Sequence, residues 1–224
     1  MKKFVFDVDG TLTPSRGKIN SDFEKFILDF TVNNFVYLVT GSDYPKTVEQ
    51  IGEKLALKVK RIYNCLGCDV WEQGINVRNK TWTLPERAHK WLSKQMTDSA
   101  FPLRTGLHFE HRPGMCNFSI VGRNATLGER KLYVKWDNER DERNHIAYNF
   151  NKLFPKIEAR PGGETGIDIA PKGWDKSQIL VDFASSDEIY FYGDRMDKQG
   201  NDWPLANANN KGKNFHVKDG SQPR

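Results

Sequence analysis

Short apolar runs and helical stripes alternate along residues 1–70. Segments 4–6 and 35–39 are entirely apolar, which is typical of strands buried on both faces of a sheet. Apolar residues at 23, 26, 27 and 30 have the spacing of one helix face. Those at 48, 51 and 55 have the same spacing and predict a second helix with an apolar stripe. A weaker strand follows at 61–63. The order β-α-β-α-β predicts a parallel sheet with helices on its faces.

The pattern changes between residues 79 and 171. Segments 107–112 and 116–121 alternate apolar and polar residues on either side of Pro113-Gly114, which predicts an antiparallel hairpin. Such alternation is typical of a sheet with one packed face and one solvated or ligand-facing side. The segment also contains two predicted helices and two short strands. One helix carries Ala88, Trp91 and Leu92, and the other carries Ile146, Phe150 and Leu153. The strands are predicted at 157–160 and 167–170. We therefore predict an α+β insert at 79–171.

The first pattern returns after Pro171. Apolar residues at 179, 180 and 183 have helical spacing, and segment 188–192 predicts a buried strand that ends at Gly193-Asp194. A last strand is predicted at 214–217. The fold class is therefore expected to be α/β: a doubly wound parallel-sheet core, residues 1–78 and 172–224, is interrupted by the insert.

Composition excludes several classes of protein. The 224 residues carry 34 Lys and Arg against 29 Asp and Glu, a formal charge of +5, which suits an anionic small substrate as well as nucleic acid. No apolar run could cross a bilayer, and the first strand follows no secretion signal, so we expect a cytoplasmic protein without a membrane partner. Cys65 and Cys68 are expected to be reduced thiols. The charged run 135–143 is expected to be a solvated helix face.

The first strand ends in two carboxylates, Asp7 and Asp9. Residues two apart on a strand point the same way, so both side chains converge at the carboxyl end of the sheet, where ligands bind in open parallel sheets. Two close carboxylates repel each other unless a cation bridges them. One carboxylate can then attack a phosphorus atom while its neighbour moves a proton. Gly10 permits a sharp turn, and Thr11 offers a hydroxyl and an N–H to a phosphate.

The string Asp7–Thr13 resembles motif I of the haloacid dehalogenase superfamily, whose members transfer phosphoryl groups through an aspartyl-phosphate. Segment 35–42 resembles the second motif of that superfamily. This resemblance implies that the hydroxyl of Thr40 or Ser42 holds the transferred phosphoryl group. Lys176 resembles the lysine of the third motif, which offsets the phosphoryl charge.

The same resemblance implies a magnesium site and the roles of two carboxylates. Asp194 and Asp202 match the acidic motif that holds Mg²⁺, together with Asp7 and the backbone carbonyl of Asp9. Hard oxygen ligands of this kind suit Mg²⁺. Asp7 is the expected nucleophile. Asp9 is expected to protonate the leaving sugar oxygen and then to act as base for the incoming hydroxyl.

Short sequence motifs between residue 4 and about residue 208 resemble those of one family within this superfamily, the eukaryotic-type phosphomannomutases. The most specific are Gly-Trp-Asp-Lys at 173–176 and three spaced arginines in the insert. In that family the insert is a cap of the C2b kind that covers the active site and forms a dimer contact. The resemblance implies a hexose-phosphate substrate, interconversion of mannose 6-phosphate and mannose 1-phosphate, and a homodimer formed through residues 79–171.

This family resemblance also implies a sugar-phosphate pocket. Arginine forks bind phosphate oxygens in pairs, and the family uses three cap arginines for the phosphate that does not react. The residues implied are Arg16, Arg112, Asn117, Arg123, Arg130 and Asp168. With a sugar phosphate as substrate, we expect no nucleic-acid partner.

Departures from the family pattern keep the outcome of the reaction open. Gly166 stands where the family usually has a serine, and Cys65–Gly67 and Arg195-Met196 replace its Glu-Asn-Gly and Lys-Thr strings. Water could attack the aspartyl-phosphate instead, which would make the protein a sugar-phosphate phosphatase. A third hypothesis is a non-enzymatic binder of nucleic acid. Its affinity would fall by roughly 0.9 log units per log unit of salt for each phosphate neutralised.

Overall fold

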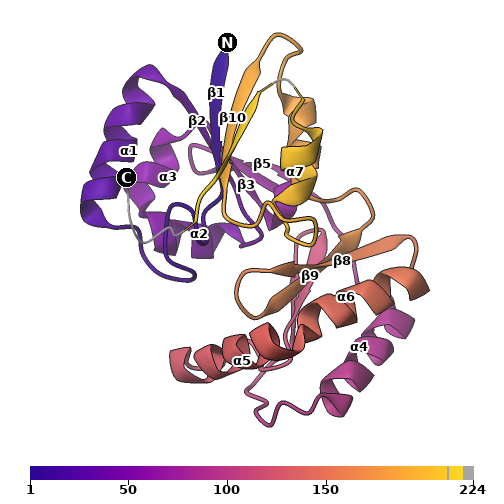
Figure 1. Cartoon of the computed structure of the whole chain (residues 1–224). Helices are drawn as coiled ribbons and strands as arrows, with labels where there is room; N and C mark the ends of the chain where they lie inside the picture. The colour runs from indigo at the N-terminus through magenta and orange to yellow at the C-terminus, as the bar shows by residue number, and fades with distance from the viewer. Residues whose placement is uncertain (211, 219–224) are drawn as a thin grey trace. The chain divides into compact units, whose positions relative to one another are not determined.

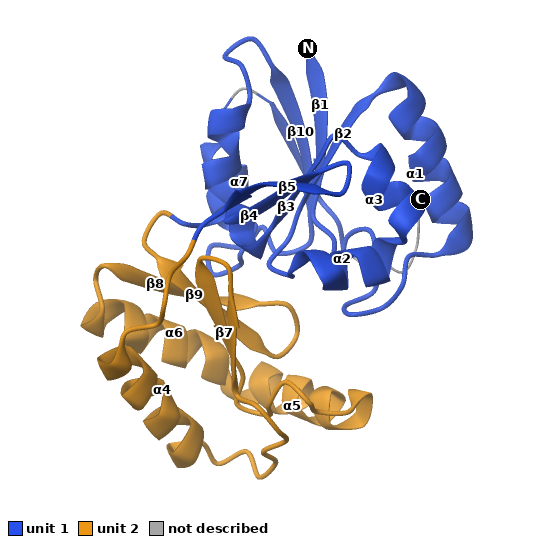
Figure 2. Ribbon diagram, turned by 180° about the vertical axis from the view of Figure 1, so that it is seen from behind, with its two compact units in different colours: residues 1–80, 174–224 blue, residues 81–173 orange. Residues whose placement is uncertain are grey.

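A computed structural model describes residues 1–210 and 212–218. The chain divides into two compact units (Figure 2): the core unit, Met1–Lys80 with Trp174–Arg224, and the insert unit, Thr81–Gly173. The chain passes between the units at 80/81 and 173/174, where the sequence predicted 78/79 and 171/172. Within the described ranges, no helix has both the length and the apolar character needed to cross a bilayer.

A seven-stranded sheet forms the centre of the core unit, in the order β11-β10-β1-β2-β3-β4-β5 (Figure 1). β1 pairs in parallel with β10 and β2, and the parallel pairing extends to β11 and β3. The predicted α/β class is confirmed. The strands are β1 (Lys2–Phe6), β2 (Phe35–Val39), β3 (Arg61–Asn64), β4 (Asp69–Glu72), β5 (Ile75–Asn79), β10 (Glu188–Gly193) and β11 (Lys213–His216).

Alternate residues of the central strands pack on opposite faces of this sheet. On β2, Val36 and Leu38 belong to one hydrophobic cluster and Val39 to the other, as the two-residue period of a strand requires. Helices α1 (Ser21–Asn33), α2 (Tyr44–Ile51) and α3 (Glu53–Lys58) contribute to the first cluster, and the 3₁₀ helix η2 (Lys176–Asp182) and helix α7 (Trp203–Ala208) to the second. Both faces are therefore covered, as expected for a doubly wound sheet.

Three elements of the core unit differ from the sequence prediction. The stripe at 48–55 belongs to two helices that break at Gly52, whose φ of 81° lies in the left-handed region. The predicted helix at 179–183 is the 3₁₀ helix η2, whose first turn is capped by the Asp175 side chain. The antiparallel hairpin β4–β5 was not predicted, although residues 75–78 alternate apolar and polar and Gly74 precedes them as a turn residue.

The insert unit has an antiparallel sheet in the order β6-β7-β9-β8, with strands β6 (Phe109–Arg112), β7 (Met115–Phe118), β8 (Ile157–Gly162) and β9 (Gly166–Pro171). Phe118 and Ile167 on one face pack into a cluster with helices α4 (Glu86–Asp98), α5 (Leu127–Arg140) and α6 (Glu142–Leu153). In the register of the sheet, Glu110 lies opposite Asn117, and Asn117 lies opposite Asp168. This row of polar residues marks the other face, which the alternating pattern predicted.

The charged run 135–143 is not uniformly solvated, so that prediction was wrong at two positions. Asp137 and Arg143 are each only 8% exposed, and Arg143 Nε donates to Asp137 Oδ2 at 2.7 Å. Arg143 Nη1 also donates to the carbonyl of Gly163 at 2.9 Å. The pair joins the α5–α6 corner to the β8–β9 turn. Hydrogen bonds of this kind are what allow a charged pair to be buried.

Candidate active site

Three neighbouring parallel strands of the core unit end in the polar residues of the candidate site. Asp7 follows β1, Asp194 follows β10 and Thr40 follows β2. The backbone N–H of Asp7 continues the ladder by donating to the carbonyl of Tyr192 at 2.9 Å. The site thus lies at the carboxyl ends of adjacent strands, where peptide geometry gathers side chains from distant parts of the sequence.

Gly10 lets the loop after β1 approach the end of β10. Its φ is 85°, and a Cβ on this residue would lie 2.3 Å from Asp194 Oδ2. Any other residue would clash with that carboxylate and strain the backbone. The glycine of the Asp7–Thr13 string therefore brings the loop against Asp194.

Lys176 joins two of the carboxylates. Its Nζ donates to Asp7 Oδ1 at 2.5 Å and to Asp202 Oδ1 at 2.7 Å, and its side chain is fully buried. Burial lowers the pKa of Lys176, but Asp202 and Asp7 outweigh burial, and the net effect raises that pKa. The lysine is therefore a fixed cation beside Asp7.

This cluster holds more negative than positive charge, because three carboxylates surround one lysine. Burial raises the pKa of Asp7 well above its usual range, Lys176 opposes that shift, and Asp202 and Asp194 add to it. Burial and the Asp202 carboxylate raise the pKa of Asp194 to about 6, although Lys176 and Arg195 oppose the shift. Protons thus compete for a site that holds more negative than positive charge.

A divalent cation fits this cluster. One oxygen from each of Asp7, Asp194 and Asp202 lies within 4.8 Å of the others. When ionised, these three carboxylates and the Lys176 ammonium leave two negative charges in excess, which one divalent ion would balance. The side-chain atoms that could bind the ion are all carboxylate oxygens, the ligand type that suits Mg²⁺.

The Asp9 carboxylate accepts three hydrogen bonds within the core unit. Oδ1 accepts from the backbone N–H of Arg16 at 2.8 Å and from Gln50 Nε2 at 3.0 Å. Oδ2 accepts from the Ser42 hydroxyl at 3.2 Å. These donors come from the loop after β1, from α2 and from the segment after β2. They hold the Asp9 carboxylate in one orientation beside the nucleophile candidate Asp7.

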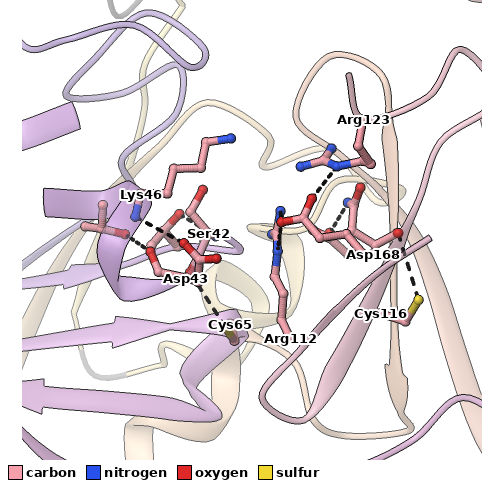
Figure 3. Close-up of polar contacts among 12 residues, drawn as sticks. Ser42, Asp43, Lys46, Cys65, Arg112, Cys116, Arg123 and Asp168 are labelled. Carbon is pink, nitrogen blue, oxygen red and sulfur yellow. Dashed lines mark hydrogen bonds and ion pairs between the residues drawn. The ribbon is translucent and has the colours of Figure 1, made fainter. Parts of the chain in front are cut away.

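The two candidate hydroxyls of the second motif have different partners. Thr40 Oγ1 accepts the backbone N–H of Ser42 at 3.0 Å, which fixes the turn after β2. The Ser42 hydroxyl contacts Asp9, and its carbonyl accepts from the Cys65 thiol at 3.8 Å (Figure 3). Of the two hydroxyls, that of Ser42 therefore contacts one of the predicted catalytic carboxylates. Thr40 acts through the backbone.

The predicted binding residues of the insert unit form three groups. Arg112 and Arg123 both donate to Glu110 (Figure 3). Asn117 Nδ2 donates to Asp168 Oδ1 at 2.7 Å across β7 and β9. The third group is built on Arg130, in the first turns of α5.

A capping box begins α5 and sets the place of Arg130. The Thr126 hydroxyl accepts the Glu129 N–H, and the Glu129 side chain accepts the Thr126 N–H. Arg130 Nη1 then donates to Thr165 Oγ1 at 2.9 Å, and Arg130 Nη2 lies 3.5 Å from Glu164 Oε2. The β8–β9 turn thus anchors this arginine.

Sequence reasoning missed three polar residues that contact the predicted ones: Gln50, Glu110 and Thr165. Gln50 is 3% exposed and lies next to the apolar residues of a helix face. A buried polar side chain needs a hydrogen-bond partner, so its position in the sequence was the available signal. Glu110 lies two residues before Arg112, so strand alternation places both on one face. Thr165 gave no sequence signal, because its contact with Arg130 spans 35 residues.

Comparison with known sequences identifies relatives along nearly the whole chain. The sequence model of the eukaryotic phosphomannomutases matches residues 23–220. A phosphomannomutase of Saccharomyces cerevisiae is 30% identical over 211 residues, which cover 90% of this chain and 83% of that protein. A phosphomannomutase of Galdieria sulphuraria is 31% identical over 209 residues, with the same coverage of each chain.

Solved structures share the fold at low sequence identity. A truncated IMP-nucleotidase of Plasmodium falciparum aligns with a TM-score of 0.67 at 14% identity, over 99% of this chain and 67% of that one. The C-terminal domain of a trehalose-6-phosphate phosphatase of C. albicans aligns with a TM-score of 0.62 at 17% identity, over 92% and 72% of the two chains. A haloacid dehalogenase-like hydrolase of Bacteroides thetaiotaomicron aligns with a TM-score of 0.56 at 15% identity, over 92% and 84%.

Proposed function

This chain belongs to the eukaryotic phosphomannomutase family, and from that premise we propose that it interconverts mannose 6-phosphate and mannose 1-phosphate by phosphoryl transfer through Asp7. The observation that carries the proposal is the buried cluster of Asp7, Lys176, Asp194 and Asp202 at the carboxyl end of the sheet. A carboxylate that is held between a fixed ammonium and other acidic groups is arranged for nucleophilic attack on phosphorus.

In the first step, a carboxylate oxygen of Asp7 attacks the phosphorus atom of a sugar phosphate. The new bond joins that oxygen to phosphorus, and the bond from phosphorus to the sugar oxygen breaks. Asp9 gives its proton to the leaving oxygen. The Lys176 ammonium and the Ser42 hydroxyl stabilise the negative charge on the transferred phosphoryl oxygens.

In the second step, a sugar hydroxyl attacks the phosphorus atom of the aspartyl-phosphate. Asp9 now takes the proton of that hydroxyl, and the Asp7 carboxylate is released. The three hydrogen bonds to Asp9 support both roles, because they keep one orientation of its carboxyl group. When that hydroxyl belongs to a hexose monophosphate, the product is a hexose bisphosphate. Asp7 then attacks the other phosphorus atom of the reoriented bisphosphate, which releases the isomeric monophosphate and restores the aspartyl-phosphate.

Asp7, Asp194 and Asp202 would hold Mg²⁺ through side-chain oxygens, with the Asp9 carbonyl as a further ligand. When bound, Mg²⁺ supplies positive charge that offsets the excess of carboxylates and the charge of the phosphoryl group. The raised pKa of Asp7 supports this assignment, since the nucleophile must be ionised and the charge of Mg²⁺, added to that of Lys176, would favour that form.

The arginines of the insert unit are assigned to the phosphate that does not react. A mutase must hold a bisphosphate intermediate by its distal phosphate, and Arg112, Arg123 and Arg130 supply guanidinium forks for that purpose. Arg16, Asn117 and Asp168 are assigned to the same pocket through the family resemblance. The resemblance also underlies our proposals of a cytoplasmic location and of a homodimer formed through the insert unit.

The experiment that tests the proposal is a ³¹P NMR time course. It contains the protein, Mg²⁺, mannose 1-phosphate and a trace of glucose 1,6-bisphosphate as phosphoryl donor. We expect the mannose 6-phosphate resonance to grow while inorganic phosphate stays low. Growth of inorganic phosphate alone would instead establish a phosphatase, and an unchanged spectrum would contradict phosphoryl transfer altogether.

Hydrolysis is the second candidate function, and Gly166 favours it. This residue offers no hydroxyl to the distal phosphate, and an added Cβ would lie 2.6 Å from Asn117 Nδ2. A weaker hold on the bisphosphate would give water more time to attack the aspartyl-phosphate. The same NMR experiment separates the two outcomes.

The acidic partners of the arginines argue against the nucleic-acid hypothesis. Glu110 binds Arg112 and Arg123, and Glu164 lies close to Arg130. Each paired carboxylate reduces the positive potential that would attract a polyphosphate backbone. We therefore propose a discrete phosphate group as the ligand of this face.

A further inference from the structure

Glu110 bridges two arginines on the polar face of the insert sheet. Arg112 Nε and Nη2 both donate to Glu110 Oε1, at 2.9 and 2.8 Å. Arg123 Nε donates to the other carboxylate oxygen, Oε2. One side chain therefore contacts two guanidinium groups, which come from β6 and from the segment after β7.

The bridge lies in a largely desolvated place. The side chains of Arg112 and Arg123 are 5% and 12% exposed, and that of Glu110 is 31% exposed. Burial pushes the pKa of Glu110 upward, but Arg112 and Arg123 outweigh it and hold the pKa at about 2. Glu110 is therefore ionised at any pH at which the protein would work.

A carboxylate at this place has a cost and a benefit for phosphate binding. Its charge repels a phosphate dianion and cancels part of the charge of the two arginines. However, two neighbouring guanidinium groups repel each other, and each side chain has many rotamers that binding must restrict. A bridge that fixes both groups in advance removes that ordering cost.

We propose that Glu110 is a positioning residue that presets the guanidinium groups of Arg112 and Arg123 for the distal phosphate of the substrate. This inference rests on the proposed function, because it takes the two arginines as phosphate ligands. It goes further by giving a role to an acidic residue whose charge alone would weaken the binding of an anion.

Two substitutions separate positioning from simple charge balance. Glu110→Gln keeps the length of the side chain and removes its charge. Glu110→Asp keeps the charge and shortens the reach, so that it can no longer contact both arginines. Positioning predicts weaker phosphate binding in both variants. Charge balance alone predicts tighter binding in Glu110→Gln and little change in Glu110→Asp.

The binding measurement is isothermal titration calorimetry with glucose 1,6-bisphosphate and Mg²⁺. It is made in an Asp7→Asn background so that no turnover occurs. We expect the dissociation constant to rise roughly 10- to 100-fold in both Glu110 variants, the range expected for a small misplacement of binding groups. With Asp7 restored, KM should rise by a similar factor. Labelling of the protein by acetyl phosphate, which has no second phosphate, should keep its rate.

Glu158→Gln provides a matched control. Glu158 pairs with Arg160 at 2.5 Å, two residues along β8, just as Glu110 pairs with Arg112 along β6. A Glu158→Gln variant should bind the bisphosphate within about twofold of the parent. Thermal unfolding of every variant shows whether a binding change merely reflects lost structure.

The outcomes distinguish this inference from the proposed function. Tighter binding in Glu110→Gln, or unchanged binding in both Glu110 variants, would overturn the positioning role and leave the proposed function intact. An unchanged NMR spectrum for the wild-type protein, together with bisphosphate binding that weakens in both Glu110 variants, would overturn the function and leave the positioning role in place.

Discussion

At the scale of single residues, the chemistry of the core unit depends on an imbalance of charge. Lys176 is shared by Asp7 and Asp202, and Asp194 adds a third carboxylate nearby. Burial, followed by the negative charges of Asp202 and Asp194, raises the pKa of Asp7 despite its lysine partner. Added positive charge would favour the ionised form of this candidate nucleophile.

This imbalance predicts opposite effects of Asp7→Asn on activity and on stability. Phosphoryl transfer should fall by at least about a thousandfold, because the amide cannot form the aspartyl-phosphate. Since the folded state raises the pKa of Asp7, ionised Asp7 opposes folding at neutral pH, and a neutral amide should stabilise the metal-free protein. We expect a Tm that is higher by about 2–4 °C at pH 7.5 for each kcal/mol gained.

The measurements are the NMR time course and a thermal melt in a chelating buffer. Asp22→Asn, an exposed change in the first turn of α1, serves as the control and should leave activity unaltered. Substantial turnover by Asp7→Asn would remove Asp7 as the nucleophile. A lower Tm would show that the ion pair with Lys176 outweighs the repulsion among the carboxylates.

The sequence predicts site residues that directly follow a strand, because the end of the strand fixes their position. It does not predict the residues that hydrogen-bond to them from distant parts of the chain. Asp7 and Asp194 follow apolar strands, so their place at one sheet edge is predictable. Gln50 contacts Asp9 across 41 residues of sequence, and no local period encodes such a contact. The missed residues are therefore those that orient the predicted ones.

At the scale of elements, the hairpin β4–β5 extends the parallel sheet with an antiparallel edge. Its two-residue loop is Gln73-Gly74, because Glu72 and Ile75 still form a pair in the ladder. Both loop residues have positive φ, 48° and 81°, as in a type I′ turn. Glycine adopts this region freely, whereas glutamine does so at a cost.

We therefore predict that Gln73→Asn stabilises the protein. Asparagine is the preferred first residue of a type I′ turn, and the gain should be about 0.5–1 kcal/mol. Gly74→Ala is the matched opposite change, since alanine is strained at this φ, and it should destabilise the protein by a similar or larger amount. Urea unfolding monitored by circular dichroism measures both. Equal stability of the two variants would contradict the assigned turn.

Element boundaries show where local patterns stop being informative. The apolar stripe of 48–55 has correct helical spacing, yet the chain forms two helices because Gly52 takes a left-handed conformation. At 176–182 three apolar residues suggested a helix, and the chain forms 3₁₀ turns that bury Lys176. Apolar spacing encodes neither the positive φ that Gly52 adopts nor the ion pairs of Lys176 with Asp7 and Asp202.

At the scale of the whole molecule, the two units build their hydrophobic cores by different rules. The core unit packs helices on both faces of its sheet, and the insert unit packs them on one face and leaves a polar row on the other. The change from continuous apolar runs to alternating ones made this organisation predictable. The nucleophile candidate and the arginine groups consequently belong to different units.

This division predicts that Mg²⁺ stabilises the core unit in a pH-dependent way. The three carboxylates proposed as its ligands, Asp7, Asp194 and Asp202, all lie in the core unit. Near pH 7.5 and at about 100 times the dissociation constant, binding should contribute about 2.7 kcal/mol, which raises the Tm of the core unit by roughly 5–10 °C. At pH 5.0 the gain should largely vanish, because Asp194, with a pKa of about 6, is then protonated.

The metal-free protein should show the opposite trend, and differential scanning calorimetry tests both. The pKa of Asp7 and of Asp194 is raised in the folded state, so their contribution to stability grows as the pH falls from 7.5 to 5.0. Glu110, whose pKa is about 2, stays ionised over this range and does not mask the effect. Asp194→Asn should abolish the magnesium shift and reduce the pH trend, of which the Asp7 contribution remains. If magnesium raised the Tm equally at both pH values, Asp194 would not be a metal ligand for which protons and Mg²⁺ compete.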